Sequence, residues 1–331
     1  MASPEPLEKQ STSMTCANNS PEPKAPLKGR FAPSPSGRMH AGNIYAALCS
    51  WLIVKSQGGS MVLRIDDLDP DRCKPAFAIQ VMRDFEQLGL FWDEGPFYQQ
   101  GREEAYRAAF ETIGEQAEVY PCFCTRADLH AASAPHFGER NVYAGTCRRL
   151  SAAERQERAD AGRRCSWRVA VPDAALTFSD LLQGPQESNL AKECGDFVIR
   201  RADNAYGYHL ATVVDDAEQG VNCVVRGIDL LSSTPQQIYL QELLGLPQPT
   251  YGHLPLMVNQ EGKRLAKRDR DAALDQLLCQ YGTAEALIGH IAFIGGLQPS
   301  DEPSSPQKLL EVFQLEDFAA KAAAHFAITW Q

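Results

Sequence analysis

The residues best suited to chemistry in this chain surround His40, where a turn rich in Pro, Ser and Gly leads into an expected helix. Residues 30–33 indicate a short strand, and apolar side chains recur at helical spacing from Ala41 to the glycine pair at 58–59. Free backbone N–H groups in the first turn of a helix favour anions, so this arrangement predicts a nucleotide phosphate site. The alternative is an ordinary strand, turn and helix with a surface histidine, because His-x-Gly alone is a weak signal.

A basic loop far downstream favours the phosphate site over that alternative. Lys263, Arg264, Lys267 and Arg268 place four cations within six residues, in a chain of formal net charge −10. A solvated run of charge is the ordinary explanation of such a cluster. Here the cations follow the apolar stretch 254–258 and several turn residues, as a loop leaving the end of a strand does. We therefore interpret the two segments together as parts of one nucleotide site.

Three cysteines and a tyrosine follow one another at spacings that suit a metal ion. One residue separates Cys122 from Cys124, eighteen separate Cys124 from Tyr143, and three separate Tyr143 from Cys147. Three thiolates and one hard donor suit a four-coordinate structural zinc ion, although free buried cysteines would be the better interpretation of Cys-x-Cys alone. Residues 127–141 have little capacity to form a core, which favours zinc. The rival candidates for the fourth ligand are His130 and His136.

An alternation of strands and helices predicts the framework that positions these residues. Such alternation specifies an α/β fold with a doubly wound parallel sheet, whose ligands bind beyond the carboxyl ends of the strands. The cysteine-containing segment begins near residue 120, so we expect an insert between two halves of one nucleotide-binding fold. The predicted strands are 30–33, 61–65, 166–171, 197–201, 210–214 and 223–226, and the predicted helices are 41–56, 75–90 and 102–116.

Length and composition limit the class of protein. At 331 residues the chain is long enough for about two domains. No apolar run approaches the roughly 20 residues that span a bilayer, so we expect no membrane role. Residues 1–28 are rich in Pro, Ser, Glu and Lys and predict a disordered extension rather than a signal peptide. Ten cysteines without such a signal indicate reduced thiols and a cytoplasmic location, and nothing in the sequence indicates more than a monomer.

The two phosphate-site segments resemble the hallmarks of the class I aminoacyl-tRNA synthetases. Residues 40–43 (His-Ala-Gly-Asn) resemble the HIGH motif, and residues 264–268 (Arg-Leu-Ala-Lys-Arg) resemble a variant of the KMSKS motif. Further segments are similar to the glutamyl branch of that family, and the resemblance spans about residues 29–270 in the right order. These segments are 30–36, 63–69, 208–216 and 225–230.

The resemblance implies a Rossmann-type catalytic domain that is interrupted by a zinc-containing, acceptor-type insert and followed by a short helical region. The glutamyl-queuosine tRNA(Asp) synthetases are the most similar group within the family, and their zinc ligands match Cys122, Cys124, Tyr143 and Cys147. The expected domains are a disordered extension at 1–28, the first half of the Rossmann domain at 29–118, the insert at 119–195, the second half at 196–262, and the KMSKS-like loop with a helical C-terminal region at 263–331.

The resemblance also implies ATP-dependent activation of an amino acid, with Mg²⁺ accompanying ATP. Nucleotidyl transfer by in-line attack at the α-phosphate needs mainly positioning and neutralisation of charge. His40 and the helix start are expected to serve the phosphates near the α position, and Lys267 is expected to hold the departing pyrophosphate. The expected catalytic residues are His40, Gly42, Asn43 and Lys267, and the expected ATP-binding residues are His40, Arg264, Leu265, Ala266, Lys267 and Arg268.

A glutamate substrate carries two carboxylates and one ammonium group, so its pocket should contain two arginines and at least one acid. Arg30 and Arg226 fit the two arginines, with Tyr208 as a neutral donor beside them, and which arginine takes which carboxylate stays open. Ser34 and Asp66 resemble family residues that face the ammonium group. The full set of expected glutamate-binding residues is Arg30, Phe31, Ala32, Pro33, Ser34, Asp66, Tyr208 and Arg226.

Three positions depart from the family pattern. Asp66 stands where most members have a glutamate, so either a water fills the gap of one methylene or the substrate shifts. The structural alternative is that Asp66 caps the chain or pairs with Arg64, and that Tyr208 belongs to the core. Arg264 keeps a cation where a lysine is usual, whereas Ala266 lacks the hydroxyl of the usual serine.

The expected reaction follows from the resemblance and from the short C-terminal region. The chain of 331 residues extends 64 residues beyond Lys267, whereas a separate anticodon-binding domain usually needs about 100 or more, so we expect none. The resemblance then implies activation of L-glutamate without tRNA and its transfer to the queuosine base at the wobble position of tRNA(Asp). The first alternative is a shortened glutamyl-tRNA synthetase that charges a tRNA 3′ end. The second is a non-catalytic tRNA-binding relic, which would have no need of His40, Lys267, Arg30 and Arg226.

Overall fold

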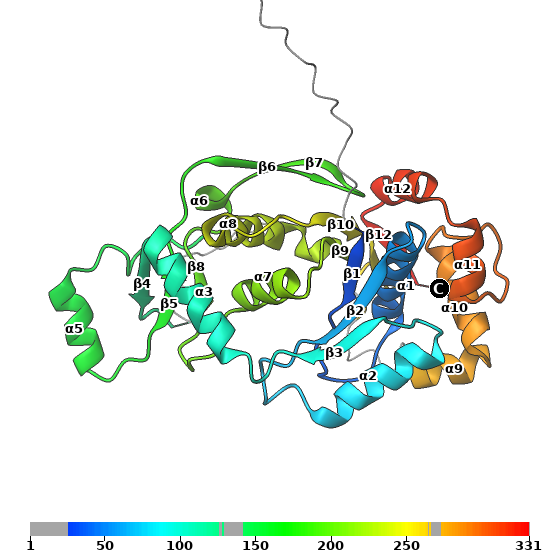
Figure 1. The fold of residues 1–331 in the computed structure, drawn as a ribbon, viewed down its shortest axis with the longest axis horizontal. Helices are drawn as coiled ribbons and strands as arrows, with labels where there is room; N and C mark the ends of the chain where they lie inside the picture. Colours follow the sequence, from blue (N-terminus) through cyan, green and yellow to red (C-terminus); the bar gives the residue numbers. More distant parts are fainter. Residues whose placement is uncertain (1–25, 126–127, 129–141, 264, 266–272, 331) are drawn as a thin grey trace, which may run out of the picture.

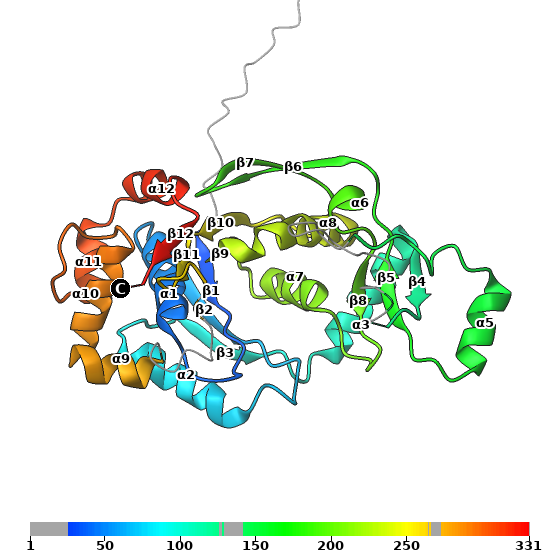
Figure 2. The same ribbon diagram turned by 180° about the vertical axis from the view of Figure 1, so that it is seen from behind.

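Two mainly parallel sheets lie side by side in the centre of the molecule, with the cysteine-containing segment at one end and the C-terminal helices at the other (Figure 1). Figure 2 shows the same arrangement from behind. The computed structural model describes residues 26–125, 128, 142–263, 265 and 273–330. The predicted disordered extension lies almost wholly outside the described residues and stays a prediction.

The first sheet has the strand order β1-β2-β3, and all its pairs are parallel. The second has the order β7-β6-β10-β9, in which β10 pairs in parallel with both β6 and β9. The sheets meet where the backbone N–H of Asn222 donates to the carbonyl of Lys28 at 3.0 Å, so β1 lies beside β9. Their strands are β1 (Lys28–Phe31), β2 (Ser60–Ile65), β3 (Glu94–Tyr98), β6 (Ala175–Asp180), β7 (Gly184–Asn189), β9 (Cys223–Gly227) and β10 (Thr250–Leu254). The α/β class with parallel sheets is confirmed.

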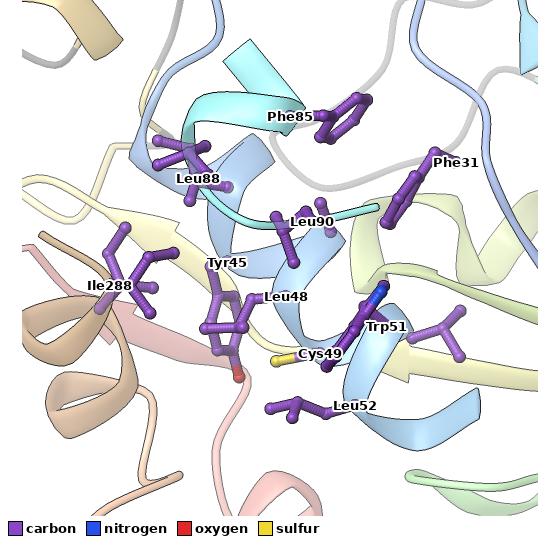
Figure 3. Close-up of a cluster of buried hydrophobic side chains, with 14 of the residues drawn as sticks. Phe31, Tyr45, Leu48, Cys49, Trp51, Leu52, Phe85, Leu88, Leu90 and Ile288 are labelled. Atoms are coloured by element: carbon purple, nitrogen blue, oxygen red, sulfur yellow. The ribbon is translucent and has the colours of Figure 1, made fainter. Parts of the chain in front are cut away.

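Helix α1 (Ala41–Lys55) is buried on nearly all sides because it packs between the first sheet and the C-terminal helices. Figure 3 shows its Tyr45 and Trp51 within the main core, which also takes side chains from the amphipathic helix α2 (Pro75–Gln87). The ring of Phe31 stacks on Phe85 of α2 at 4.5 Å between centroids. The helices predicted at 41–56 and 75–90 are therefore confirmed.

The helices α3 (Glu103–Gln116), α7 (Tyr208–Glu218) and α8 (Thr234–Leu244) pack against one another around a second core. The prediction of a strand at 210–214 is wrong, because these residues form the middle of α7. Two valines and a threonine favour a strand, but every residue from Leu210 to Asp216 is buried. A short apolar run looks the same in a buried helix as in a buried strand.

The cysteine-containing segment leads into a small antiparallel sheet with the order β4-β5-β8. Its strands β4 (Val119–Cys122), β5 (Ser166–Val169) and β8 (Phe197–Arg200) confirm the strands predicted at 166–171 and 197–201. The exposed helix α5 (Ala152–Asp160) projects from this end of the molecule, and the short helix α6 (Leu190–Glu193) follows the β6–β7 hairpin (Figure 1). The boundaries predicted at 119 and 195 stay a prediction.

The C-terminal residues fold back on the first core. Strand β12 (Ala327–Thr329) pairs in parallel with β11 (Leu256–Val258). The intervening helices are α9 (Leu274–Tyr281), α10 (Ala284–Ile294), α11 (Pro306–Val312) and α12 (Leu315–Ala323), and the 3-10 helix η1 (Ile228–Ser233) precedes α8. Among the described residues no single helix is long and apolar enough to cross a membrane, although α9 and α10, bent at 99°, pass a test of length and composition as a pair.

Candidate active site

His40 stands at the start of α1, as the sequence predicts. It occupies the N-cap position, where its carbonyl accepts from the backbone N–H of Asn43 at 2.8 Å. The Asn43 side chain accepts in return from the backbone N–H of His40 at 3.3 Å. A Cβ on Gly42 would lie 3.3 Å from two atoms of the His40 ring, so glycine leaves room for the ring to fold over the first turn. The helix start is therefore shaped by the same three residues that the sequence singles out.

Both described flanks of the KMSKS-like loop lie beside this helix start. The backbone N–H of Leu265, which is buried, donates to the carbonyl of Met257 in β11 at 3.2 Å. On the far side of the loop, Ala273 forms an antiparallel bridge with His40, and the N–H of Leu274 donates to the carbonyl of Met39 at 2.9 Å. Leu265 is thus bonded to β11, and residues 273 and 274 are bonded to the His40 segment. Arg264, Ala266, Lys267 and Arg268 lie outside the described residues.

Arg30 and Arg226 are buried on the adjacent strands β1 and β9, each with 6% of its surface exposed. The Nε of Arg30 donates to Oδ1 of Asp216 at 3.3 Å. The Nε of Arg226 donates to Nε2 of His253 at 3.1 Å, and its Nη2 donates to Oγ1 of Thr234 at 2.9 Å. The Nη1 of Arg226 is buried and has no hydrogen-bond partner within the part of the chain that the structure describes. The two predicted arginines therefore come together, and one of them has a free donor.

The acidic side of the site is organised by Arg64, which is fully buried in β2. Its Nη1 donates to Oδ1 of Asp216 at 2.5 Å, and its Nε donates to Oδ1 of Asp66 at 2.7 Å. The alternative that Asp66 pairs with Arg64 is therefore confirmed. Burial raises the pKa of Asp66, and the ion pair with Arg64 opposes that rise only in part. Burial also opposes the charge of Asp216, but Arg64 and then Arg30 lower its pKa below the ordinary value.

Helix α7 brings Tyr208, His209 and Asp216 to this site. Tyr208 is the first residue of the helix and 40% exposed, so it is not part of the core. The His209 ring lies 5.3 Å from the Tyr208 ring, and its Nδ1 is buried without a hydrogen-bond partner among the described residues. Burial, together with the positive charge of Arg226, lowers the pKa of His209 to about 4. His209 is therefore a neutral group at neutral pH.

The remaining predicted glutamate residues are Phe31, at the end of β1, and three residues of the turn that follows it, Ala32, Pro33 and Ser34. The Phe31 ring is 3% exposed and belongs to the core, whereas Ser34 is exposed. The Pro33 carbonyl accepts from the backbone N–H of Asp66 at 3.0 Å, which fixes the turn beside the end of β2. Ala32, between Phe31 and Pro33 in the chain, is half-buried.

Sequence reasoning missed several residues that shape the site. Asp216 and His209 lie within segment 208–216, which resembles the glutamyl branch. Their position in that segment is the only sequence signal that links them to the site. Neither His253 nor Asp180 belongs to any quoted segment, although His253 lies beside Arg226 in the register of β9 and β10. Only the pairing of strands distant in the chain reveals them.

The predicted metal ligands converge at the antiparallel sheet. The sulfur atoms of Cys122, Cys124 and Cys147 all lie within 4.8 Å of one another. The Tyr143 hydroxyl lies 3.5 Å from Sγ of Cys122 and accepts from the backbone N–H of Cys147 at 2.9 Å. Its ring is covered by the guanidinium of Arg168, 3.9 Å from the ring centroid. Three soft donors and one oxygen at this spacing fit a tetrahedral ion. The rivals His130 and His136 lie outside the described residues.

Comparison with known proteins places this geometry in a family. The family model of the catalytic domain of class I tRNA synthetases (E and Q) matches residues 26–319. The chain belongs to this family. Among curated relatives of this class I synthetase, a glutamyl-Q tRNA(Asp) synthetase of Symbiobacterium thermophilum is 46% identical over 87% of the chain and 93% of the relative. A relative of the same name from Nitratidesulfovibrio vulgaris is 40% identical over 85% of the chain and 90% of the relative.

Solved structures support the same assignment. A glutamate tRNA ligase from Elizabethkingia meningosepticum, in complex with its amino acid, has a TM-score of 0.76 at 25% identity and covers 93% of this synthetase. A glutamate-tRNA synthetase from Elizabethkingia anophelis gives 0.77 at 25% identity and covers the same share. The match covers 67% and 68% of those longer chains. The fold is therefore that of a class I glutamyl synthetase, and the protein is a ligase of that class.

Proposed function

We propose that this synthetase uses ATP to activate L-glutamate without tRNA and then transfers the glutamyl group to the queuosine base at the wobble position of tRNA(Asp). The observation that carries the proposal is the pair of buried guanidinium groups, Arg30 and Arg226, on adjacent strands beside the His40 helix start. The printed names of the curated relatives support the choice of acceptor.

The pocket has a charge pattern that suits glutamate. Arg30 and Arg64 share Asp216, and Arg64 also holds Asp66. Arg226, by contrast, makes its hydrogen bonds to His253, Thr234 and the Leu230 carbonyl, so no carboxylate bonds to it directly within the described residues. Its buried positive charge and unpartnered Nη1 are therefore available for one carboxylate of the substrate. Tyr208, which is partly exposed to solvent, offers a neutral hydrogen-bond donor at the surface of this site.

In the first reaction, an α-carboxylate oxygen of glutamate attacks the α-phosphorus of ATP. The bond between that phosphorus and the bridging oxygen to the β-phosphate breaks, pyrophosphate leaves, and glutamyl-adenylate remains. The amide groups at the start of α1, with His40 and Asn43, would bind phosphate oxygens, because a helix N-terminus stabilises anions. Lys267, with Arg264 and Arg268, would neutralise the departing pyrophosphate, from a loop whose flanks are tied beside His40. Mg²⁺ accompanies ATP.

In the second reaction, a nucleophile of the queuosine base attacks the acyl carbon of the adenylate, and AMP leaves. The test uses labelled glutamate, ATP and tRNA(Asp) that contains or lacks queuosine. We expect label only on the tRNA that contains queuosine, and it should survive removal of the terminal adenosine. Label that is lost with that adenosine would identify a shortened tRNA-charging enzyme instead. No label on either tRNA, with no activation of glutamate, would identify a non-catalytic relic.

The cysteine cluster is proposed to hold one structural zinc ion through Cys122, Cys124, Tyr143 and Cys147. The zinc ion would tie the end of β4 to the segment around Tyr143 and Cys147, which has only a small hydrophobic cluster of its own. Arg168 over the Tyr143 ring and the N–H of Cys147 on its hydroxyl would orient the oxygen ligand. We further propose that the enzyme works as a monomer in the cytoplasm, with the domain boundaries given above.

A further inference from the structure

His253 is completely buried between an acid and the substrate arginine. Its Nδ1 lies 2.5 Å from Oδ2 of Asp180, and its Nε2 lies 3.1 Å from Nε of Arg226. The three residues come from β6, β10 and β9, which are neighbours in the second sheet. A carboxylate, an imidazole and a guanidinium therefore form one line across three strands.

The hydrogen-bond chemistry of this line allows only one tautomer. A guanidinium Nε–H can donate but not accept, so Nε2 of His253 is the unprotonated nitrogen; it also lies 3.1 Å from Oγ1 of Thr234, whose hydroxyl can donate to it. The ring proton then lies on Nδ1, where the Asp180 carboxylate accepts it. Asp180 is itself held by the backbone N–H groups of Leu182, Gln183 and His253, at 2.9 to 3.1 Å from its Oδ1.

Burial, helped by the positive charge of Arg226, favours the neutral form of His253. Asp180 from β6, Arg226 from β9, Asp229 from η1 and Tyr251 from its own strand face it. Burial first, and then Arg226, lower the pKa of His253, and Asp180 and Asp229 offset this only in part. The imidazole thus separates Arg226 from Asp180. A carboxylate bonded directly to Arg226 would neutralise the charge that the substrate needs, as Asp66 and Asp216 do for Arg64.

We propose that Asp180 and His253 are positioning residues for amino-acid binding: they hold Arg226 through a neutral acceptor, so that its charge and its Nη1 stay available for a substrate carboxylate. Thr234 completes the arrangement, because its Oγ1 accepts from Nη2 of Arg226. The inference rests on the proposed activation of glutamate. It adds two residues that neither touch the reacting atoms nor belong to any motif of the sequence.

The test is Asp180→Asn, which keeps the shape of the side chain. The new amide would donate to Nδ1 of His253 and force the proton onto Nε2, opposite the Arg226 Nε–H; an aspartate-to-asparagine change has this effect in other buried acid–histidine pairs. We expect KM for glutamate in tRNA-independent pyrophosphate exchange to rise by about tenfold or more, with KM for ATP unchanged. His253→Gln should retain more glutamate affinity than His253→Leu, because an amide oxygen can still accept from Arg226.

Asp196→Asn is the matched control. Asp196 is a similarly buried aspartate that accepts from Tyr120 and from the backbone N–H of Val171, and none of its hydrogen bonds within the described residues goes to Arg226 or His253. The Asp196→Asn substitution should leave KM for glutamate unchanged. Equal KM for Asp180→Asn and the wild type would overturn the inference while leaving glutamate activation standing. No exchange with glutamate in the wild type would instead remove the proposed function itself.

If Asp180→Asn fails to fold, the tautomer of His253 can still be measured in the wild-type protein. Nitrogen NMR of histidine-labelled protein should show one ring that is protonated at Nδ1 and bare at Nε2 at neutral pH, and His253→Gln should remove its signal. A His253 ring protonated at Nε2 would contradict the inference, because it could not accept from Arg226.

Discussion

The arginine-rich pocket and the cysteine cluster are held together in opposite ways. The pocket joins strands and helices that are far apart in the sequence, and Arg64 at its centre is bonded to Asp66 and Asp216 while fully buried. The cysteine cluster brings together Cys122, Cys124, Tyr143 and Cys147, and its hydrophobic cluster among the described residues is small. The pocket therefore takes its shape from the core of the whole fold, whereas we expect the cluster to depend on the proposed zinc ion. Changes in one region should leave the other intact.

The largest expected effect is the loss of glutamate activation in Arg226→Ala. Removing a buried charged donor from a carboxylate costs about 2–5 kcal/mol, so kcat/KM for glutamate should fall by at least about thirtyfold. Pyrophosphate exchange at varied glutamate and varied ATP measures this, and KM for ATP should change little. An equal loss for both substrates would contradict the assignment of Arg226 to the amino-acid pocket.

The next effect is on stability. Arg64→Met removes the cation between Asp66 and Asp216, so that buried Asp66 loses its ion pair and Asp216 keeps only Arg30, which should lower the free energy of unfolding by about 3–5 kcal/mol. Urea unfolding followed by circular dichroism measures it. Arg107→Met, which breaks an exposed pair with Glu104, is the control and should have no measurable effect. A wild-type stability for Arg64→Met would show that this ion-pair network does not hold the pocket.

Removal of the proposed zinc ion should disturb only the cysteine cluster. Under a strong chelator, the rate of hydrogen exchange should rise at two amides. The Phe123 amide donates to Sγ of Cys147, and the Cys147 amide donates to the hydroxyl oxygen of Tyr143. Hydrogen exchange at the amides of β2 should not change, and once the chelator is removed and Mg²⁺ is restored the rate of tRNA-independent pyrophosphate exchange should equal that of the untreated protein. Metal analysis should find about one zinc per chain. A folded protein purified without zinc, with these amides still protected, would refute the metal site.

The smallest effect is the pH dependence contributed by His209. Its pKa is lowered to about 4 in the fold, against about 6.5 in the unfolded chain, so the unfolded chain binds its proton first as the pH falls. Stability should therefore decrease between about pH 6.5 and 4, by no more than about 3 kcal/mol, with no contribution at higher pH. His209→Gln should flatten this part of the curve of unfolding free energy against pH. An unchanged curve would contradict the burial of a neutral imidazole there.

The predictable part of the fold comes from local signals. The helix that starts at His40 carries a turn before it, apolar side chains at helical spacing and glycines after it, and the structure confirms it. The run at 210–214 carries no such signals, because it is apolar on every side and its helix is defined by packing. Local pattern therefore predicts elements with one solvent-facing side better than fully buried ones.

The site residues that the sequence predicts come from its resemblance to the synthetase family. The other site residues are revealed only by which strands pair and in what register. The segments that resemble the glutamyl branch predict Arg30 and Arg226, and the structure brings the two arginines to adjacent strands. Asp66 was placed by the same resemblance, yet one oxygen of its shorter side chain is bonded to Arg64. His253 and Asp180 belong to no motif, because their role depends on which strands pair.

The most direct test of the whole account is pyrophosphate exchange into ATP with glutamate, aspartate and glutamine in turn, in the absence of any tRNA. A site with two buried arginines on adjacent strands, proposed for the two carboxylates of glutamate, should support exchange with glutamate alone. Exchange that begins only after tRNA is added would contradict tRNA-independent activation and favour a shortened tRNA-charging enzyme. Exchange with none of the three amino acids, with or without tRNA, would contradict the catalytic account.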